Sequence, residues 1–353
     1  MRWVLLVYFW LFWVPAQSTD TSFQSLFVVK TDTDNNGGCA QYLDQFETFI
    51  AECKELVNAG LQVFEDAAKP VSTREGRVAR SYLWTYFRIN DDAQAMASVK
   101  NYLTRVKDFL GGETSTDKAH LYCNDEWLEK EHLTDAAKDK DGNDRWQDYP
   151  DGSRAPYAIF QIPEYREYLF FKNDDGMWEP ISDKVPYWSD DLKDYIFDSD
   201  YEGGTYCTPA ANLAVTQERT TPKTMTFCPR ALRSRNYVTR TLGSRAPTRG
   251  DSIQVNVPLS GTLYHELFHL VIGNYHTYDL EYLWSKQQKA LEINPYQAVK
   301  NQDRDYLSLL RENPETYLFF SVGYWYFQQT RWGTVAKPNR RWSFHSGVAE
   351  LIQ

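Results

Sequence analysis

The stretch Gly261-Thr-Leu-Tyr-His-Glu-Leu-Phe-His-Leu-Val-Ile272 decides how the rest of the chain is interpreted. Apolar residues surround His265, Glu266 and His269 and leave almost no polar face, which predicts a buried helix. Side chains four residues apart on a helix lie on the same face, with Cβ atoms about 6 Å apart. Two imidazoles at this spacing can hold one tetrahedral Zn²⁺. Glu266 follows the first histidine, where a carboxylate can accept a proton from a zinc-bound water.

The alternative is a chance match in which both histidines are ordinary core residues. The chain has only six histidines, and a chance match would also have to fall on a buried helix. A His-Glu-His set in so apolar a helix is costly to bury without a metal ion or polar partners. We therefore predict a zinc site, with His265 and His269 as ligands and Glu266 as a catalytic base.

Composition and charge indicate a globular protein and exclude some classes of partner. At 353 residues the chain can bury a sizeable core, and its aromatic content of 16% is typical of a packed globular protein. The net charge of −10 and the isoelectric point near 5.2 argue against nucleic acid or an anionic membrane as the main partner.

The first residues predict a signal peptide at 1–16. Arg2 is followed by an apolar run of twelve residues, Trp3 to Val14, and Ala16 offers a cleavage site. A span of the bilayer needs about 20 apolar residues, so this run is too short to cross it. We expect a secreted, extracellular protein with no membrane attachment after cleavage. Five cysteines fit an oxidising compartment, although the odd number leaves one unpaired or intermolecular.

Composition also divides the mature chain. Residues 17–75 are predicted to be an N-terminal helical or pro-segment-like region, followed by a catalytic domain at 76–335 and a tail at 336–353. Helical spacing predicts helices at about 41–68, 77–87 and 92–110. Residues 124–206, which hold 22 acidic and 9 basic residues, form an acidic insert in the catalytic domain. Deletion of this insert would show whether it has an interaction role of its own.

A small sheet and a closing helix complete the expected fold. Strands are predicted at 119–123, 224–228 and 252–257, with a short hairpin around Thr221-Pro222. Residues 302–329 carry an apolar pattern that predicts a helix, which would cover the helix at 261–272.

A catalytic zinc needs a third protein ligand and one open position for water. The residues that follow the helix at 261–272 offer three kinds of candidate: Asp279, His276, and Glu292 or a later Glu on a following helix. Spacing alone leaves the choice open.

The segment His276-Thr-Tyr-Asp-Leu-Glu-Tyr-Leu283 resembles the Gly-Thr-x-Asp-x-x-Tyr-Gly signature of the aspzincins, the fungal deuterolysin and peptidyl-Lys endopeptidase group. Thr277, Asp279 and Tyr282 match the signature, whereas His276 and Leu283 replace its glycines. Weaker similarity extends over about 80–330. It covers Ser81–Phe87, Ala119–Cys123, Tyr206-Cys207, Asn212–Thr216, Phe227–Pro229 and Asn313–Phe320.

The resemblance implies a predominantly helical α+β fold, zincin-like, with a small β-sheet. It implies Zn²⁺ bound by His265, His269 and Asp279, and a peptide or protein substrate cleaved by zinc-activated water with Glu266 as the general base. Tyr282 would be a catalytic hydroxyl donor, and Tyr278 is a weaker candidate. Core packing is the alternative role for either tyrosine. The alternative function is a non-catalytic secreted zinc-binding or interaction protein that keeps the scaffold.

The resemblance also implies a disulfide between Cys123 and Cys207, which would leave Cys228 without its family partner. Cys39 and Cys53 could pair only if the first helix begins after Cys39, because 14 helical residues span about 21 Å.

Overall fold

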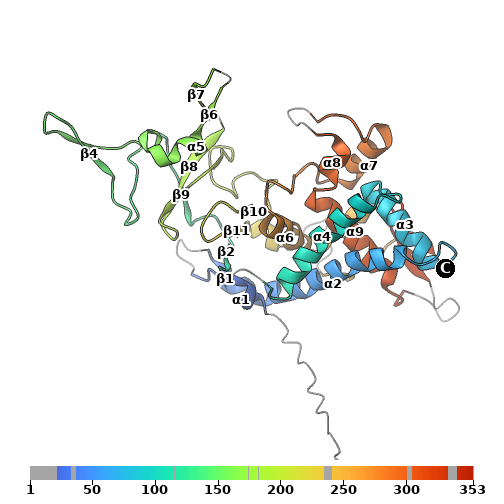
Figure 1. Ribbon diagram of the computed structural model, residues 1–353. Helices are drawn as coiled ribbons and strands as arrows, with labels where there is room; N and C mark the ends of the chain where they lie inside the picture. The colour runs from blue at the N-terminus through green and yellow to red at the C-terminus, as the bar shows by residue number, and fades with distance from the viewer. Residues whose placement is uncertain are drawn as a thin grey trace, which may run out of the picture.

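The computed structural model describes residues 22–32, 37–113, 117–173, 175–181, 183–233, 241–299, 304–332 and 340–352 (Figure 1). The predicted signal peptide at 1–16 lies outside these residues. None of the described helices has the length and apolar character needed to cross a membrane. The fold is mixed α/β, with a helical body and several small sheets.

The helical body is built around α2 (Leu43–Ala67), which packs against α3 (Arg74–Phe87), α4 (Ala93–Leu110) and α9 (Pro314–Gln328). The expected helices at 41–68, 77–87 and 92–110 are thereby confirmed. Their starts follow from capping: the side chain of Thr73 accepts a hydrogen bond from Gly76 N, and that of Asp92 accepts one from Ala95 N. Because α2 supplies a large share of the buried core, removal of 17–75 would expose that core.

The helix α6 (Gly261–Ile272), which carries His265, Glu266 and His269, lies inside this body, in contact with α4 and α9. The structure differs from the sequence pattern at 302–329, whose described part forms two helices, α8 (Tyr306–Leu310) and α9, instead of one. Pro314 is the reason, because proline lacks the N–H that a helix interior needs and fits only the first turn.

The main sheet has the order β1-β2-β11-β10 and lies beside α6. Its strands are β1 (Phe27–Val29), β2 (Ala119–Tyr122), β10 (Ala214–Gln217) and β11 (Thr224–Phe227). β2 is parallel to β1 and β11, whereas β10 and β11 form an antiparallel hairpin. The expected strands at 119–123 and 224–228 and the hairpin are confirmed, and β10 is an edge strand of the described sheet.

The expected strand at 252–257 is wrong. Residues Ile253–Asn256 form a 3₁₀ helix, in which Ile253 and Asn256, three positions apart, are both buried. The side chain of Ser252 accepts a hydrogen bond from Gln254 N and so caps this turn. The alternation of polar and apolar residues was therefore misleading, because the cap decides the local structure.

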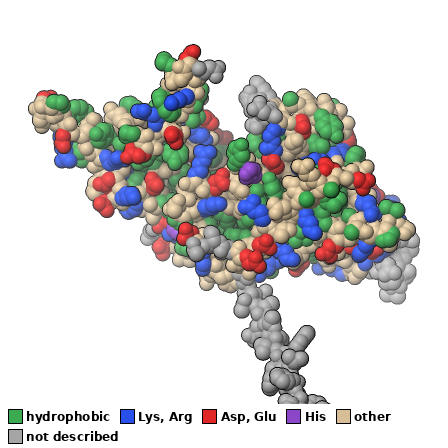
Figure 2. All heavy atoms as spheres, in the orientation of Figure 1, with side chains coloured by type: hydrophobic (Ala, Val, Ile, Leu, Met, Phe, Trp, Pro, Cys, Tyr) green, Lys and Arg blue, Asp and Glu red, His purple; other side chains and the backbone are tan. Residues whose placement is uncertain are grey.

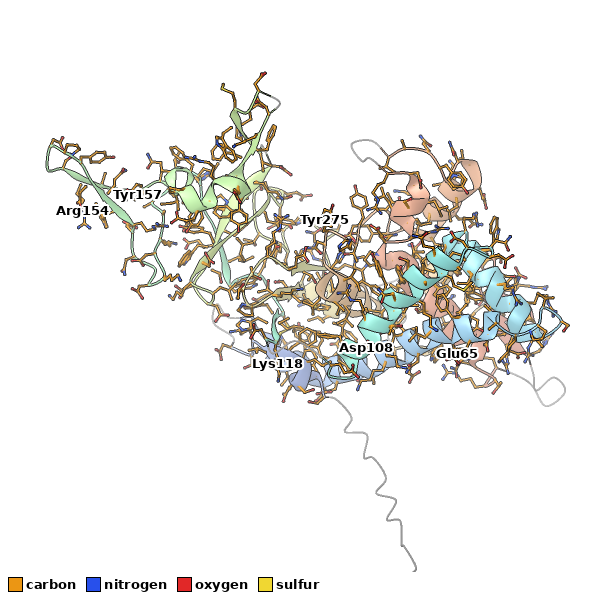
Figure 3. The ribbon with its side chains drawn as sticks, in the orientation of Figure 1. Glu65, Asp108, Lys118, Arg154, Tyr157 and Tyr275 are labelled. Carbon is orange, nitrogen blue, oxygen red and sulfur yellow. A yellow bond between two sulfur atoms is a disulfide. The ribbon has the colours of Figure 1, made fainter. Side chains whose placement is uncertain are left out.

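The insert at 124–206 forms a lobe beside the sheet (Figure 1). It has one small apolar core of its own and shares a second with Tyr122 of β2. Its three-stranded sheet pairs β8 (Lys184–Ser189) with β3 (Leu128–Lys130) and β9 (Asp194–Ser199). Two hairpins project from the lobe, β4 (Trp146–Asp148) with β5 (Arg154–Pro156) and β6 (Phe170–Lys172) with β7 (Trp178–Pro180). The short helix α5 (Arg166–Leu169) precedes β6. Figure 3 labels Arg154 and Tyr157 on the first hairpin.

The disulfides differ from those implied by the resemblance. Cys39 is bonded to Cys123 and Cys207 to Cys228, while Cys53 is free and buried. The parallel pairing of β1 with β2 brings Cys39 to the end of β2, since Cys39 N bonds Lys30 O. Cys53 lies inside α2, and its side chain is buried in the core, away from a bond with Cys39.

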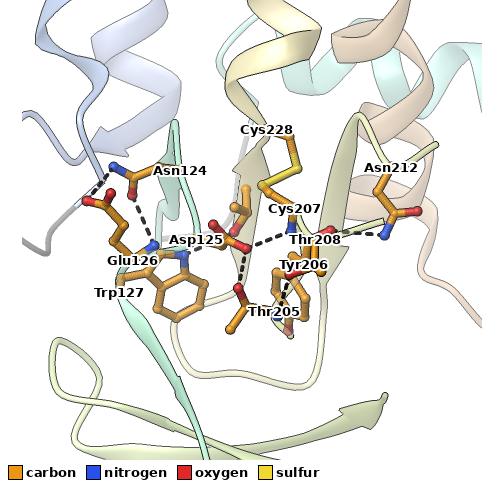
Figure 4. The surroundings of a disulfide bond; sticks show 11 residues. Asn124, Asp125, Glu126, Trp127, Thr205, Tyr206, Cys207, Thr208, Asn212 and Cys228 are labelled. Atoms are coloured by element: carbon orange, nitrogen blue, oxygen red, sulfur yellow. Dashed lines mark hydrogen bonds between the residues drawn. A yellow bond between two sulfur atoms is a disulfide. The ribbon is translucent and has the colours of Figure 1, made fainter. Parts of the chain in front are cut away.

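Both ends of the insert are thus covalently tied to the main body. At the second end, shown in Figure 4, the Asp125 carboxylate accepts hydrogen bonds from the Thr205 hydroxyl and from Cys207 N, the latter at 2.7 Å. The described part of the predicted tail also packs on the body: β12 (Arg341–Ser343) pairs with β13 (Glu350–Ile352), and Phe344 between them is buried.

Candidate metal centre

Three side-chain atoms converge where α6 meets the loop that follows it. The Nε2 atoms of His265 and His269 lie 3.2 Å apart, and Asp279 Oδ1 lies 3.0 Å from each of them. In a tetrahedral zinc site with bonds of about 2.0–2.1 Å, ligand atoms are separated by about 3.3 Å. The triangle therefore has the size of one face of such a site, and these three residues form a group that could hold a metal ion.

Hydrogen bonds on the outer nitrogens orient both imidazoles. His265 Nδ1 lies 3.1 Å from Glu315 Oε2, in the first turn of α9. His269 Nδ1 lies 2.8 Å from Thr277 Oγ1, whose hydroxyl donates to Gly273 O at 2.9 Å. A carboxylate only accepts, and the Thr277 oxygen is left to accept because its proton is already used. Both histidines therefore carry their proton on Nδ1.

This arrangement leaves three acceptor atoms facing one another. Both Nε2 atoms present lone pairs, and Asp279 adds a carboxylate oxygen, so a cation or a proton is needed between them. Electrostatics agree: burial lowers the pKa of His265, but the Asp279 and Glu315 carboxylates outweigh it and hold that pKa well above its usual range. Burial raises the pKa of Asp279, yet the two imidazoles lower it overall. The site attracts positive charge.

The other two candidate ligands lie elsewhere. His276 is exposed and its ring meets the edge of Tyr275 at 5.0 Å. Glu292 is exposed on α7 (Trp284–Ile293), where its carboxylate accepts a hydrogen bond from Gln288 at 3.0 Å. Among the described residues, the metal-competent group contains neither of them. The geometry therefore favours Asp279 over the alternatives that the sequence left open.

Glu266 and Tyr282 both line the cavity at this triangle, but one is buried and the other is exposed. Glu266 is buried, and its Oε2 accepts a hydrogen bond of 2.7 Å from the Thr216 hydroxyl on β10. Tyr282 is 53% exposed, and its ring stacks on His265 with centroids 5.7 Å apart. Desolvation of its hydroxyl and the nearby Asp279 carboxylate raise the pKa of Tyr282, so the phenol keeps its proton at neutral pH.

A cavity of about 970 Å³ opens above the triangle and is lined by His265, Glu266, His269, Asp279 and Tyr282. Its walls are α6, β10 and the insert, which contributes Lys184, Phe197, Asp198 and Tyr201. The hollow is visible in Figure 2 between the insert at the upper left and the α7–α8 segment at the upper right. Tyr275, which is 86% exposed, lies at its mouth (Figure 3).

Three supporting residues were not assigned a role from the sequence. Thr277 and Glu315 orient the histidines, and Thr216 holds Glu266. All three belong to segments that carry the aspzincin resemblance, and this was the one signal that could have pointed to them. Comparisons with protein-family models, with curated proteins and with solved structures found no match to this chain.

Proposed function

We propose that the chain is a secreted zinc-dependent endopeptidase related to the aspzincins, with a zincin-like catalytic domain. The observation that carries the proposal is the convergence of three acceptor atoms, each about 3 Å from the others, directly beside a buried glutamate on the same helix. A structural zinc site is closed by four protein ligands, whereas a catalytic site has three and an open position. Here the described group contains three, and it faces a cavity.

The chemistry follows from the roles of the chain's own side chains. A zinc ion bound by His265, His269 and Asp279 would lower the pKa of a bound water and polarise the carbonyl of a peptide. Thr216 holds Oε2 of Glu266, which leaves Oε1 to accept the proton of the attacking water and to pass it to the leaving amine. The protonated phenol of Tyr282 can donate a hydrogen bond to the carbonyl oxygen as negative charge develops there.

The cavity also supports a polypeptide substrate. β10 pairs with β11 on one side, and its residues Ala214–Gln217 line the cavity on the other. An edge strand offers backbone N–H and C=O groups to an extended chain, which can add to the sheet as a further strand. Because Thr216 on this strand touches Glu266, a chain paired with β10 would pass the proposed catalytic base.

Glu266→Gln is the test of this function. The variant should keep one zinc per chain and lose about 10²–10⁴-fold in the rate of cleavage of a reduced, alkylated protein, because a general base contributes that factor. Glu292→Gln is the matched control, since that carboxylate is exposed and outside the metal group; it should cleave at the wild-type rate. A Glu266→Gln variant with full activity would refute the mechanism. Zinc binding without cleavage by the wild type would favour the non-catalytic alternative.

A further inference from the structure

A second cavity, of about 500 Å³, lies beside the metal cavity. The two share Phe197, Gln217 and Arg219 as lining residues, so they are adjoining chambers of one groove between the insert and the sheet edge. The outer wall comes from the insert, and the inner wall comes from Gln217 and residues 219–221 at the turn of the β10–β11 hairpin. Nothing in the chemistry of the metal centre explains this second chamber.

The insert wall of the chamber is aromatic. Phe197 packs against Tyr165 with ring centroids 5.0 Å apart and stacks with Tyr168 at 5.6 Å. Trp188 and Tyr195 meet edge to face at 5.0 Å and complete the wall. A pocket lined by aromatic rings gains most from a large apolar or aromatic side chain, through burial and ring packing.

The charges around the chamber do not favour a charged occupant. Lys138 forms ion pairs with Glu131 and Glu129, and Lys193 pairs with Asp190 at 2.6 Å. Basic and acidic side chains both line the cavity: Lys138, Asp139, Lys140, Arg145, Glu164, Lys193, Asp194 and Arg219. Arg145 pairs with Glu164 at 3.7 Å, and the other lining charges are of both signs, Lys140 and Arg219 with Asp139 and Asp194. Neither a carboxylate nor an ammonium group therefore has a clear advantage.

The strand sets the distance between the chamber and the metal centre. Thr216 contacts Glu266, and Arg219, which lines both cavities, follows three positions later. Three residues of chain span at most about 10 Å. An extended substrate covers about 3.3 Å per residue, so about three residues separate the cleaved bond from the chamber.

The wall is also anchored before any substrate binds. The insert is tied by the disulfides at Cys123 and Cys207, and Asp191 in the β8–β9 turn bonds Lys30 at 2.7 Å and the Tyr122 hydroxyl at 2.6 Å. On the inner side, Gln217 Nε2 donates to Asp198 Oδ2 at 3.0 Å. A pre-formed wall binds a side chain without the cost of ordering it first.

We propose that this chamber is a distal specificity subsite, which binds an aromatic side chain of an unfolded polypeptide about three residues from the cleaved bond. The inference rests on the proposed peptidase function. It makes the acidic insert a determinant of substrate choice, through Tyr168 and Phe197, while zinc and Glu266 act on the peptide bond.

The test uses peptides that are identical except for Phe, Ala or Glu at the position three residues from the cut, on either side. Cut sites are first mapped by mass spectrometry of a digested, reduced protein. For the wild type, kcat/KM for the Phe peptide should exceed that for the Ala and Glu peptides by about tenfold, at the lower end of what a hydrophobic pocket discriminates. Affinity of the same peptides, labelled with a fluorophore, is measured with the zinc-loaded Glu266→Gln protein.

Two tyrosines of the insert give a matched pair of variants. Tyr168 is 44% exposed and lines the chamber, whereas Tyr149 is 42% exposed and lies on the β4–β5 hairpin outside it. Tyr168→Ala should abolish the preference for Phe in both cleavage and binding, and Tyr149→Ala should retain it. Three results would overturn the subsite. They are equal kcat/KM and affinity for the three peptides, a preference for the Glu peptide, or retention of the Phe preference by Tyr168→Ala. If the reduced protein is not cut, the peptidase function fails; Phe, Ala and Glu are then compared at one fixed position of a labelled peptide, and binding to wild type and Tyr168→Ala still decides the subsite.

Discussion

Thr277 should contribute to metal affinity although it does not touch the metal position. The residue is 3% exposed, and its oxygen is the partner of His269 Nδ1 at 2.8 Å. Thr277→Val keeps the shape of the side chain and removes that partner, so the imidazole N–H is left buried without an acceptor. Such a group costs about 1–3 kcal/mol, and loss of a partner behind a metal ligand weakens binding by about 10- to 100-fold. We expect zinc affinity to fall within this range.

The assay is competition for zinc against a fluorescent chelator at pH 7. Thr104→Val is the control, because Thr104 Oγ1 donates to Lys100 O four residues earlier on α4, just as Thr277 Oγ1 donates to Gly273 O. The control should bind zinc like the wild type. If Thr277→Val binds zinc within about twofold of the wild type, or if Thr104→Val is equally weakened, the proposed orientation of His269 is wrong.

Two further predictions concern the core. Burial raises the pKa of the Cys53 thiol, so we expect no alkylation of the native protein and one alkylated cysteine after denaturation without reductant; reaction of native Cys53 would contradict this. Burial raises the pKa of Glu52 above 4.5, although hydrogen bonds from Ser260 and Leu242 N oppose the shift. Its stabilising contribution is present at low pH and lost as the pH rises. The Tm of Glu52→Gln relative to the wild type should therefore increase from pH 4.5 to 8, and an unchanged difference would refute the assignment.

Local patterns in the sequence predicted much of the helical body. The apolar spacing of α2, α3 and α4 has a helical period, and their caps lie next to them in sequence, so short-range information was sufficient. The same reasoning failed at 252–257, where a serine cap outweighs alternation, and at Pro314, which divides an apolar pattern into two helices.

The candidate site likewise has residues that the sequence could predict and residues that it could not. His265, Glu266 and His269 are fixed by one helical turn and could be predicted from spacing, whereas the third ligand depends on how the loop after Gly273 folds back. The backbone of Gly273 has φ 102°, a conformation that favours glycine, and it turns the chain so that Thr277 and Asp279 return to α6.

The disulfides depend on still longer-range information. The pairing of Cys39 with Cys123 results from parallel strands that are distant in the chain, and no local pattern encodes it. The same holds for Glu315, which reaches His265 from a helix that lies 50 residues later.

The most direct test of the central claim is the zinc content of the purified protein, measured by mass spectrometry of the metal for the wild type and Asp279→Ala side by side. We predict about one zinc per wild-type chain and loss of that zinc in the variant, because the two imidazoles alone form an incomplete site. Equal zinc in both proteins would contradict the role of Asp279, and a wild type that binds no zinc would contradict the metal centre itself.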